Sequence, residues 1–168
     1  MAVKVGHHGG SHEGGLMVRV REAVLGDLET IVGFQQAMAQ ETEGFELDQK
    51  TLEEGVRGVF LHPTRGEYFL AEIDDEPVGG LLTVREWSDW RNGEVVWIHS
   101  LYVVPEARRQ GVFKQLYLHL KHLVDTDEGL KGLRLYVHHS NDIACSAYGA
   151  LGMDGERYRM FEWMPEDK

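Results

Sequence analysis

The sequence predicts a mixed α/β domain, and three features of its 168 residues support that prediction. Residues 101–124 comprise an apolar strand, a polar turn ending at Gly111, and a helix whose apolar positions recur every three or four residues. Asn92-Gly93 separates two strand-like segments, and this dipeptide is a strong signal for a β-hairpin. Residues 133–137 alternate apolar and polar side chains, so the helix is expected to connect two parallel strands.

Length, charge and cysteine content limit the class of protein. The 168 residues are 42% hydrophobic, which suits one domain with a full-sized core. No apolar run approaches the roughly 20 residues that span a bilayer. The single cysteine, Cys145, excludes an internal disulfide framework and a Cys-based zinc site. A formal net charge of −11 disfavours nucleic acid and favours an amine or polyamine substrate over an anionic one. We therefore expect a cytoplasmic protein with no membrane, nucleic-acid or metal site.

Residues 1–16 differ from the rest of the chain. They are rich in glycine and histidine and show no periodicity of apolar residues. His7, His8 and His12 could bind a metal, but we favour a disordered or vector-derived leader before a domain of residues 17–168.

The residue pattern in the first part of this domain predicts one strand followed by two helices. Residues 17–23 alternate apolar and polar side chains, as a half-buried strand does. Asp27 precedes a helical pattern that extends to about Gln40 and is a candidate N-cap. Asp48 is the corresponding candidate for a second helix, which ends before Pro63.

The next segments predict the centre of the sheet. Residues 68–73 and 78–85 have strand patterns, and Gly79-Gly80 is expected to weaken the second strand or form a bulge in it. The Asn92-Gly93 turn then leads into residues 94–103, which should run antiparallel to the preceding strand.

The end of the chain predicts one more helix and one more strand. Asn141 begins a short helical pattern that is broken at Gly152. Residues 158–164 are expected to form a closing strand.

The turn between residues 104 and 112 has the composition of an anion site. The first backbone N–H groups of a helix have no partner within the helix, and the helix dipole favours negative charge there. A phosphate can bind to them, and Arg108, Arg109 and Lys114 add positive charge beside the turn. The glycine and lysine spacing of the nucleotide P-loop is missing, so a different phosphate ligand is expected.

Two segments resemble the GNAT superfamily of acetyl-CoA-dependent N-acetyltransferases. Arg108 and Gly111, just after a strand ending in Val-Val-Pro, resemble the family's pyrophosphate-binding loop, in the branch that carries Arg-Arg-x-Gly-Val-Phe. Phe113 departs from the usual Gly or Ala, but the donor at this position is the backbone N–H. The second segment resembles the one after the family's fifth strand, and the opening of the domain is similar as well. In the second segment, the matching residues are Asn141, Ala144, Tyr148, Leu151, Gly152 and Met153, the last of which replaces a Phe.

The resemblance implies the GNAT fold, with acetyl-CoA as cosubstrate. In that fold a central, mostly antiparallel sheet of six or seven strands has helices on both faces, and its central strands splay apart to leave backbone groups for the cofactor. The resemblance also implies a homodimer. The residues that it assigns to the cofactor are Leu101, Val103, Arg108, Arg109, Gln110, Gly111, Val112, Phe113, Lys114 and Asn141.

The implied reaction is direct attack of a neutral amine on the thioester carbonyl. The backbone N–H of Leu101 could stabilise the oxyanion. Tyr148 matches the family's general acid, since a phenol with a pKa near 10 stays protonated at neutral pH. The alternative is a tyrosine that only packs in the core.

The general base is left open by the sequence. Histone-modifying relatives carry a Glu at the position of Trp97, which cannot act as a base. His99 is expected on the same side of the strand as Trp97 and Leu101, and it titrates near neutral pH. A packed histidine, a role for Glu41 or Glu43, and a mechanism without a dedicated base are the alternatives.

The acceptor is expected to be a small-molecule amine. Glu41 and Glu43 lie beside Phe45 in the segment that borders the acceptor pocket in the resembled family, and could hold an ammonium group. They and Trp97 are the expected acceptor-binding residues, although a solvated acidic loop is the simpler interpretation. We expect N-acetylation of a small cationic metabolite, or else of a protein amine. The rivals are a non-catalytic acyl-CoA sensor and a metal-binding module based on the leader.

Overall fold

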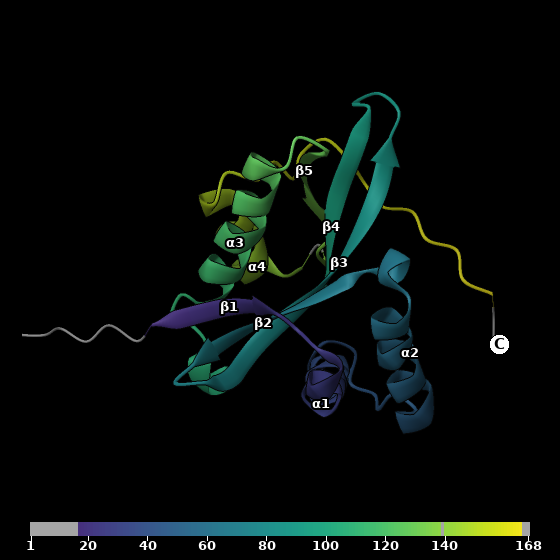
Figure 1. The fold of residues 1–168 in the computed structure, drawn as a ribbon, viewed down its shortest axis with the longest axis vertical. Coiled ribbons are helices and arrows are strands. Elements are labelled where there is room, and N and C mark those ends of the chain that lie inside the picture. Colours follow the sequence, from purple (N-terminus) through teal and green to yellow (C-terminus); the bar gives the residue numbers. More distant parts are fainter. Residues whose placement is uncertain (1–16, 139, 166–168) are drawn as a thin grey trace, which may run out of the picture.

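The computed structural model describes residues 17–138 and 140–165, so the predicted leader at residues 1–16 lies outside the described part of the chain. The described residues form five strands and four α-helices, which follow one another in the order expected from the sequence as far as the last helix (Figure 1). None of the described helices is long and apolar enough to cross a membrane. The bounds are β1 Val18–Glu22, α1 Leu28–Thr42, α2 Gln49–Leu61, β2 Glu67–Ile73, β3 Glu76–Ser88, β4 Gly93–Val103, α3 Val112–Thr126, β5 Leu130–Leu135 and α4 Asp142–Ala150.

The five strands form one mixed sheet in the order β1-β2-β3-β4-β5. Neighbouring strands from β1 to β4 are antiparallel, and β5 is parallel to β4. This confirms the predicted hairpin, which turns through residues 89–92, and the helical connection between parallel strands. β5 begins three residues before the predicted start and ends two residues before the predicted end.

Helices cover both faces of the sheet, as predicted (Figure 1). On one face α3 contributes Leu116 and Leu120 to a core that includes Phe69 of β2. On the other face α1 and α2 pack against Leu70 and Tyr68, the neighbours of Phe69 on the same strand. The alternation of side chains along β2 thus places consecutive residues in two different cores.

The predicted closing strand at residues 158–164 is wrong. This segment has no regular secondary structure, and the described sheet has five strands rather than the expected six or seven. Tyr158, Phe161 and Trp163 are 81%, 90% and 85% exposed. An alternating or apolar pattern gives a strand only where a neighbouring strand and a core accept it, and here neither does.

Of the two predicted N-caps, one is confirmed and one acts differently. Asp48 accepts a hydrogen bond from the backbone N–H of Thr51 at 2.8 Å, which is the expected cap of α2. Asp27 precedes α1, but its carboxylate accepts from the N–H of Val24 at 2.8 Å and pairs with Arg21 at 2.8 Å. The hydrogen bond from Arg21 lowers the pKa of Asp27. Asp27 therefore stabilises the turn before α1 rather than the helix itself.

Candidate active site

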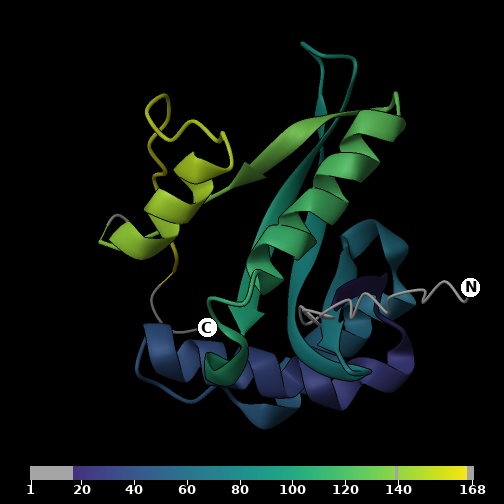
Figure 2. The same ribbon diagram turned by 90° about the vertical axis from the view of Figure 1, so that its left-hand side faces the viewer.

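The parallel strands β4 and β5 separate before β4 ends. Their paired residues run from Glu94 and Leu130 to Ile98 and Leu135, whereas β4 continues to Val103. Figure 2 shows β5 turning away from β4 toward α4. Among the described strands, β3 is consequently the only neighbour of β4 beyond Ile98, and we call the unpaired other edge of β4 the β4–β5 opening.

A bulge at Ser100 reverses the faces of the strand at this opening. Ser100 has a φ of 50°, and the pairing with β3 shifts between Gly80 and Leu82. His99 lies opposite Leu82, which packs with α1 and α2, whereas Leu101 packs in the α3 core. The prediction that His99 and Leu101 face the same side is therefore wrong, because the extra residue breaks the alternation.

The start of α3 presents unpaired backbone donors. Gly111 precedes the helix with a φ of 82°, a left-handed conformation that favours glycine, and Arg109 also has a positive φ of 63°. Among the described residues, none accepts a hydrogen bond from the backbone N–H groups of residues 110–114. Arg109 and Lys114 are exposed beside them. This arrangement has the physical requirements of an anion-binding site.

Arg108, by contrast, is already engaged by neighbouring groups. Its guanidinium donates two hydrogen bonds to Glu41 at 2.7 and 2.6 Å, and its Nε donates to the Val103 carbonyl at 2.9 Å. The carbon at its centre lies 5.7 Å from the ring centroid of Tyr102. Arg108 thus connects the end of α1 to the turn before α3. The hydrogen bonds from Arg108 also lower the pKa of Glu41.

This pair allows a prediction on stability. Replacing Glu41 with glutamine should lower the free energy of unfolding by up to about 1 kcal/mol at pH 7, because the pair is half-exposed but bidentate. The contribution should be lost as the pH falls through the lowered pKa of Glu41, because a protonated carboxyl no longer pairs with Arg108. Urea unfolding at pH 7 and in acid measures both effects.

Glu43→Gln is the matched control, since Glu43 is exposed two residues along the chain and has no ion pair among the described residues. Equal destabilisation by Glu41→Gln and Glu43→Gln would show that the pair with Arg108 contributes nothing.

Tyr148 lies at the start of α3, next to the unpaired donors. Its ring packs edge-on against Phe113 with centroids 5.3 Å apart. Burial raises the pKa of Tyr148, so the phenol is protonated at neutral pH and can donate a proton. Tyr148 belongs to α4, and Asn141 caps this helix, because the Asn141 side chain accepts a hydrogen bond from the N–H of Ala144 at 3.1 Å. The cap fixes where α4 begins and thereby where Tyr148 is placed.

His99 lies at the opening and contacts Tyr136, a residue that directly follows β5. The two rings meet edge-on with centroids 5.4 Å apart, and the Tyr136 hydroxyl lies 3.3 Å from Nδ1 of His99. Burial lowers the pKa of His99, so the imidazole is neutral near pH 7 and can accept a proton. Trp97, whose ring centroid lies 6.4 Å from that of His99, donates its indole N–H to Glu86 at 2.6 Å.

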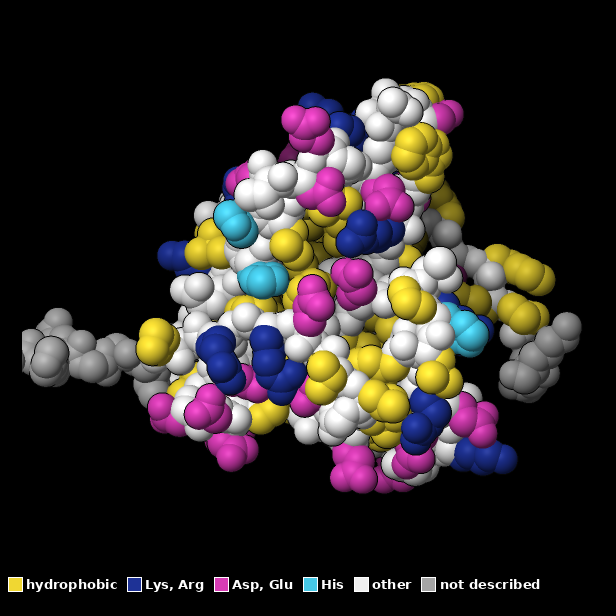
Figure 3. Space-filling model, viewed as in Figure 1, with side chains coloured by type: hydrophobic (Ala, Val, Ile, Leu, Met, Phe, Trp, Pro, Cys, Tyr) yellow, Lys and Arg dark blue, Asp and Glu magenta, His cyan; other side chains and the backbone are white. Residues whose placement is uncertain are grey.

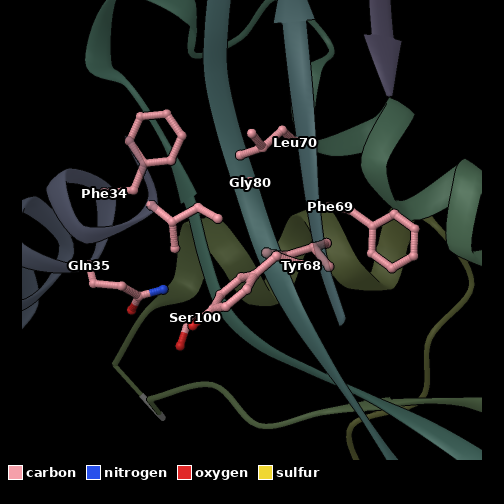
Figure 4. A pocket seen from close by; sticks show the side chains of 9 residues that line it. Phe34, Gln35, Tyr68, Phe69, Leu70, Gly80 and Ser100 are labelled. Carbon is pink, nitrogen blue, oxygen red and sulfur yellow. The ribbon is translucent and has the colours of Figure 1, made fainter. Parts of the chain in front are cut away.

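A cleft opens on the face of the sheet that carries His99. Its volume is about 320 Å³, and it is bounded by α1, α2, β2 and β4. Gln35, Tyr68 and Ser100 line both this cleft and a small cavity of about 10 Å³. Figure 4 shows these three side chains turned toward one another from three different elements. The cleft thus reaches β4 at the bulge, one residue from His99.

Comparison with known proteins identifies the family. The sequence model of the Acetyltransferase (GNAT) family matches residues 29–153, which include all but the first residue of α1, the turn before α3, and α4. This chain belongs to the GNAT acetyltransferase family. A search of curated proteins gave no significant match.

Solved structures agree with this assignment to the GNAT family. A possible acetyltransferase from Clostridium difficile 630 is 40% identical, with a TM-score of 0.82 over 89% of this chain and 99% of that chain. Aminoglycoside N-acetyltransferase AAC(6′)-Iy in complex with CoA is 19% identical, with a TM-score of 0.72 over 92% and 99% of the two chains. A probable acetyltransferase is 20% identical, with a TM-score of 0.77 over 89% and 99%. The last two likenesses show the fold alone.

The structure of this GNAT protein adds residues that the sequence did not indicate. Tyr136 contacts His99, while Gln35, Tyr68 and Ser100 line the cleft. The expected bulge near Gly79-Gly80 was the one sequence signal, because these glycines pair with Val103 and Tyr102, directly beside the shift in register between Gly80 and Leu82. Glu43, predicted to bind the acceptor, is exposed at the end of α1 and does not line the cleft.

Proposed function

We propose that this protein transfers the acetyl group of acetyl-CoA to a primary amine by direct attack. The observation that carries the proposal is the convergence of three features at one place. The β4–β5 opening, the unpaired N–H groups of residues 110–114 and the protonated Tyr148 phenol lie around the start of α3. Membership of the GNAT family and the likeness to a CoA complex support the choice of cosubstrate.

The residues present fit the chemical groups of CoA. The N–H groups of residues 110–114 would hold the pyrophosphate, with Arg109 and Lys114 adding positive charge. Backbone groups of Leu101 and Val103 border the opening and would hold the pantetheine arm. The Val103 carbonyl already accepts from Arg108, so this arm is expected to rely more on Leu101. The cosubstrate supplies an activated acetyl thioester.

In the proposed reaction, the amine nitrogen forms a bond to the carbonyl carbon and the carbon–sulfur bond breaks. Tyr148 gives its proton to the leaving thiolate, which prevents the reverse attack, and the phenolate then takes up a proton from water. The proton lost by the attacking nitrogen passes to His99 or through it to water, because the neutral imidazole lies on the face of the sheet that carries the cleft. The Leu101 N–H would stabilise the oxyanion.

The test is release of the CoA thiol from acetyl-CoA with a panel of primary amines, with the acetylated product identified by mass. We expect release that depends on both the amine and the enzyme. Binding of acetyl-CoA without turnover of any amine would contradict the proposed enzymatic activity and favour a non-catalytic acyl-CoA sensor.

A pH profile tests the role of His99. The free amine fraction falls with each pH unit below an amine pKa of about 10, and a protonated His99 cannot accept a proton. Below the pKa of His99, which lies under its ordinary value, kcat/KM should therefore fall about 100-fold for each pH unit, because both groups take up a proton. Above that pKa, kcat/KM should change about tenfold for each pH unit, because only the amine is protonated. In His99→Gln the steeper limb should disappear and the rate should fall.

His119→Gln is the matched control for this profile. Burial lowers the pKa of His119 as well, but its ring packs on Phe69 in the α3 core, with centroids 5.2 Å apart. A steep limb that persists in His99→Gln, or that is lost in His119→Gln, would exclude His99 as the base.

A further inference from the structure

The cleft next to Ser100 differs in charge from the protein as a whole. The chain has a net charge of −11, yet among the described residues Asp48 is the only carboxylate that lines the cleft. The wall formed by α2 is largely apolar or open, with Leu52, Gly55 and Val56. Figure 3 shows hydrophobic side chains gathered over α2, with charged side chains around them.

The carboxylate of Asp48 is committed to the helix that it caps. It accepts hydrogen bonds from the N–H of Thr51 at 2.8 Å and from the Thr51 hydroxyl at 2.6 Å. These hydrogen bonds lower the pKa of Asp48, and the positive end of the α2 dipole lies beside its charge. Both bonds are accepted by Oδ1, so an ammonium group at Oδ2 would meet a charge that the two donors and the helix dipole already partly compensate.

Two further candidates for negative charge are compensated or neutral. Glu41 is held by two hydrogen bonds from Arg108, which compensates its charge. Tyr68 is buried, which raises the pKa of its phenol to about 12, so it is neutral in the cleft. At the inner end of the cleft the polar groups are therefore uncharged, namely the amide of Gln35 and the hydroxyls of Tyr68 and Ser100.

We propose that the acceptor is a monoamine carried on an apolar body, and that polycations are poor acceptors. Its amino group would lie at Ser100, and its apolar body would lie along Leu52, Gly55 and Val56. A second ammonium group would be desolvated against this wall without a partner, which is unfavourable. The proposal rests on the acetyltransferase activity proposed above, and it narrows the cationic metabolite or polyamine expected from net charge to a class of monoamines set by the cleft.

The first experiment compares hexylamine with 1,5-diaminopentane, which have equal numbers of non-hydrogen atoms. We expect kcat/KM for hexylamine to exceed that for the diamine by about tenfold or more, because only the diamine brings a second charge to the apolar wall. Equal or faster turnover of the diamine would overturn the proposal.

A pair of glycine substitutions tests whether the cleft sets this preference. Gly55 lies on the cleft wall, and a Cβ added there meets nothing within 4 Å, so Gly55→Glu brings a carboxylate to the wall without a clash. Gly33→Glu on α1 makes the same charge change in equally open space but outside the cleft lining. Both changes favour the helix, because glycine is a poor helix former.

We expect Gly55→Glu to shift the ratio of the two amines toward the diamine by about tenfold or more. Gly33→Glu should leave the ratio within about twofold of the wild type, since its charge is remote from the cleft. An unchanged ratio in Gly55→Glu, or the same shift in both variants, would overturn the placement of the acceptor in this cleft.

Amine binding without acetyl-CoA separates this proposal from the proposed reaction. Calorimetry should show that hexylamine binds the wild type and Gly33→Glu more tightly than it binds Gly55→Glu. If this pattern is found but no amine gives CoA release, the cleft is confirmed as an amine-binding site, while the proposed acetyl transfer is contradicted. If hexylamine binds none of the three proteins, or all equally, the cleft proposal is overturned.

Discussion

Replacing Tyr148 with phenylalanine is expected to lower kcat by at least about tenfold, because the leaving thiolate loses its proton donor. The ring of Tyr148 packs edge-on against Phe113, and phenylalanine preserves that contact. The KM for acetyl-CoA should stay within about twofold, since the unpaired N–H groups of residues 110–114 are unchanged. Steady-state CoA release with a fixed amine measures both constants.

Tyr117→Phe is the control for this substitution. Tyr117 contacts the same Phe113 ring, with centroids 6.4 Å apart, but its hydroxyl lies 3.4 Å from the Leu151 carbonyl. It should retain kcat within about twofold, because its hydroxyl has a structural partner. An equal loss of kcat in the two variants, or no loss in Tyr148→Phe, would remove Tyr148 from the mechanism.

The second large effect is expected from reversing the charges beside the start of α3. In Arg109→Glu/Lys114→Glu the exposed cations become anions next to the expected pyrophosphate. Each unit charge at about 4 Å contributes on the order of 1 kcal/mol in water, so reversal of both should raise the KM for acetyl-CoA by about tenfold or more. The difference from wild type should shrink at high salt, because exposed charges are screened.

Lys50→Glu/Arg57→Glu makes the same change of charge on α2, where both side chains are exposed. Its KM should stay near the wild-type value if the effect is local. A rise as large as that of the double variant at α3 would mean that net charge, rather than an anion site at the turn, governs cosubstrate binding.

Local patterns predicted the elements and most of their partners. The turn signals at Asn92-Gly93, the helical periodicity after Gly111 and the strand–helix–strand order were enough to place β3, β4 and β5 in one mixed sheet, with α3 connecting β4 to β5. These features depend on residues close in sequence. The closing strand at residues 158–164 failed because strand formation also requires a neighbour that no local pattern specifies.

The candidate site was predictable only where backbone geometry follows from sequence. Gly111 indicated the turn, and the helix after it supplied unpaired donors. The bulge at Ser100 was harder to locate, because one shifted residue changes which face every later side chain occupies. The contact of His99 with Tyr136 depends on how β5 leaves β4, and the pair of Arg108 with Glu41 joins residues 67 apart in sequence. The implied homodimer stays a prediction.

The central claim is that acetyl-CoA is held at the β4–β5 opening by the start of α3. Backbone amide shifts in ¹H–¹⁵N spectra during titration with CoA test it most directly. We expect the largest changes at residues 110–114 and at Leu101, with little change on α2. If CoA binds while these amides stay unperturbed and others move, the cosubstrate lies elsewhere and the account of the site is wrong.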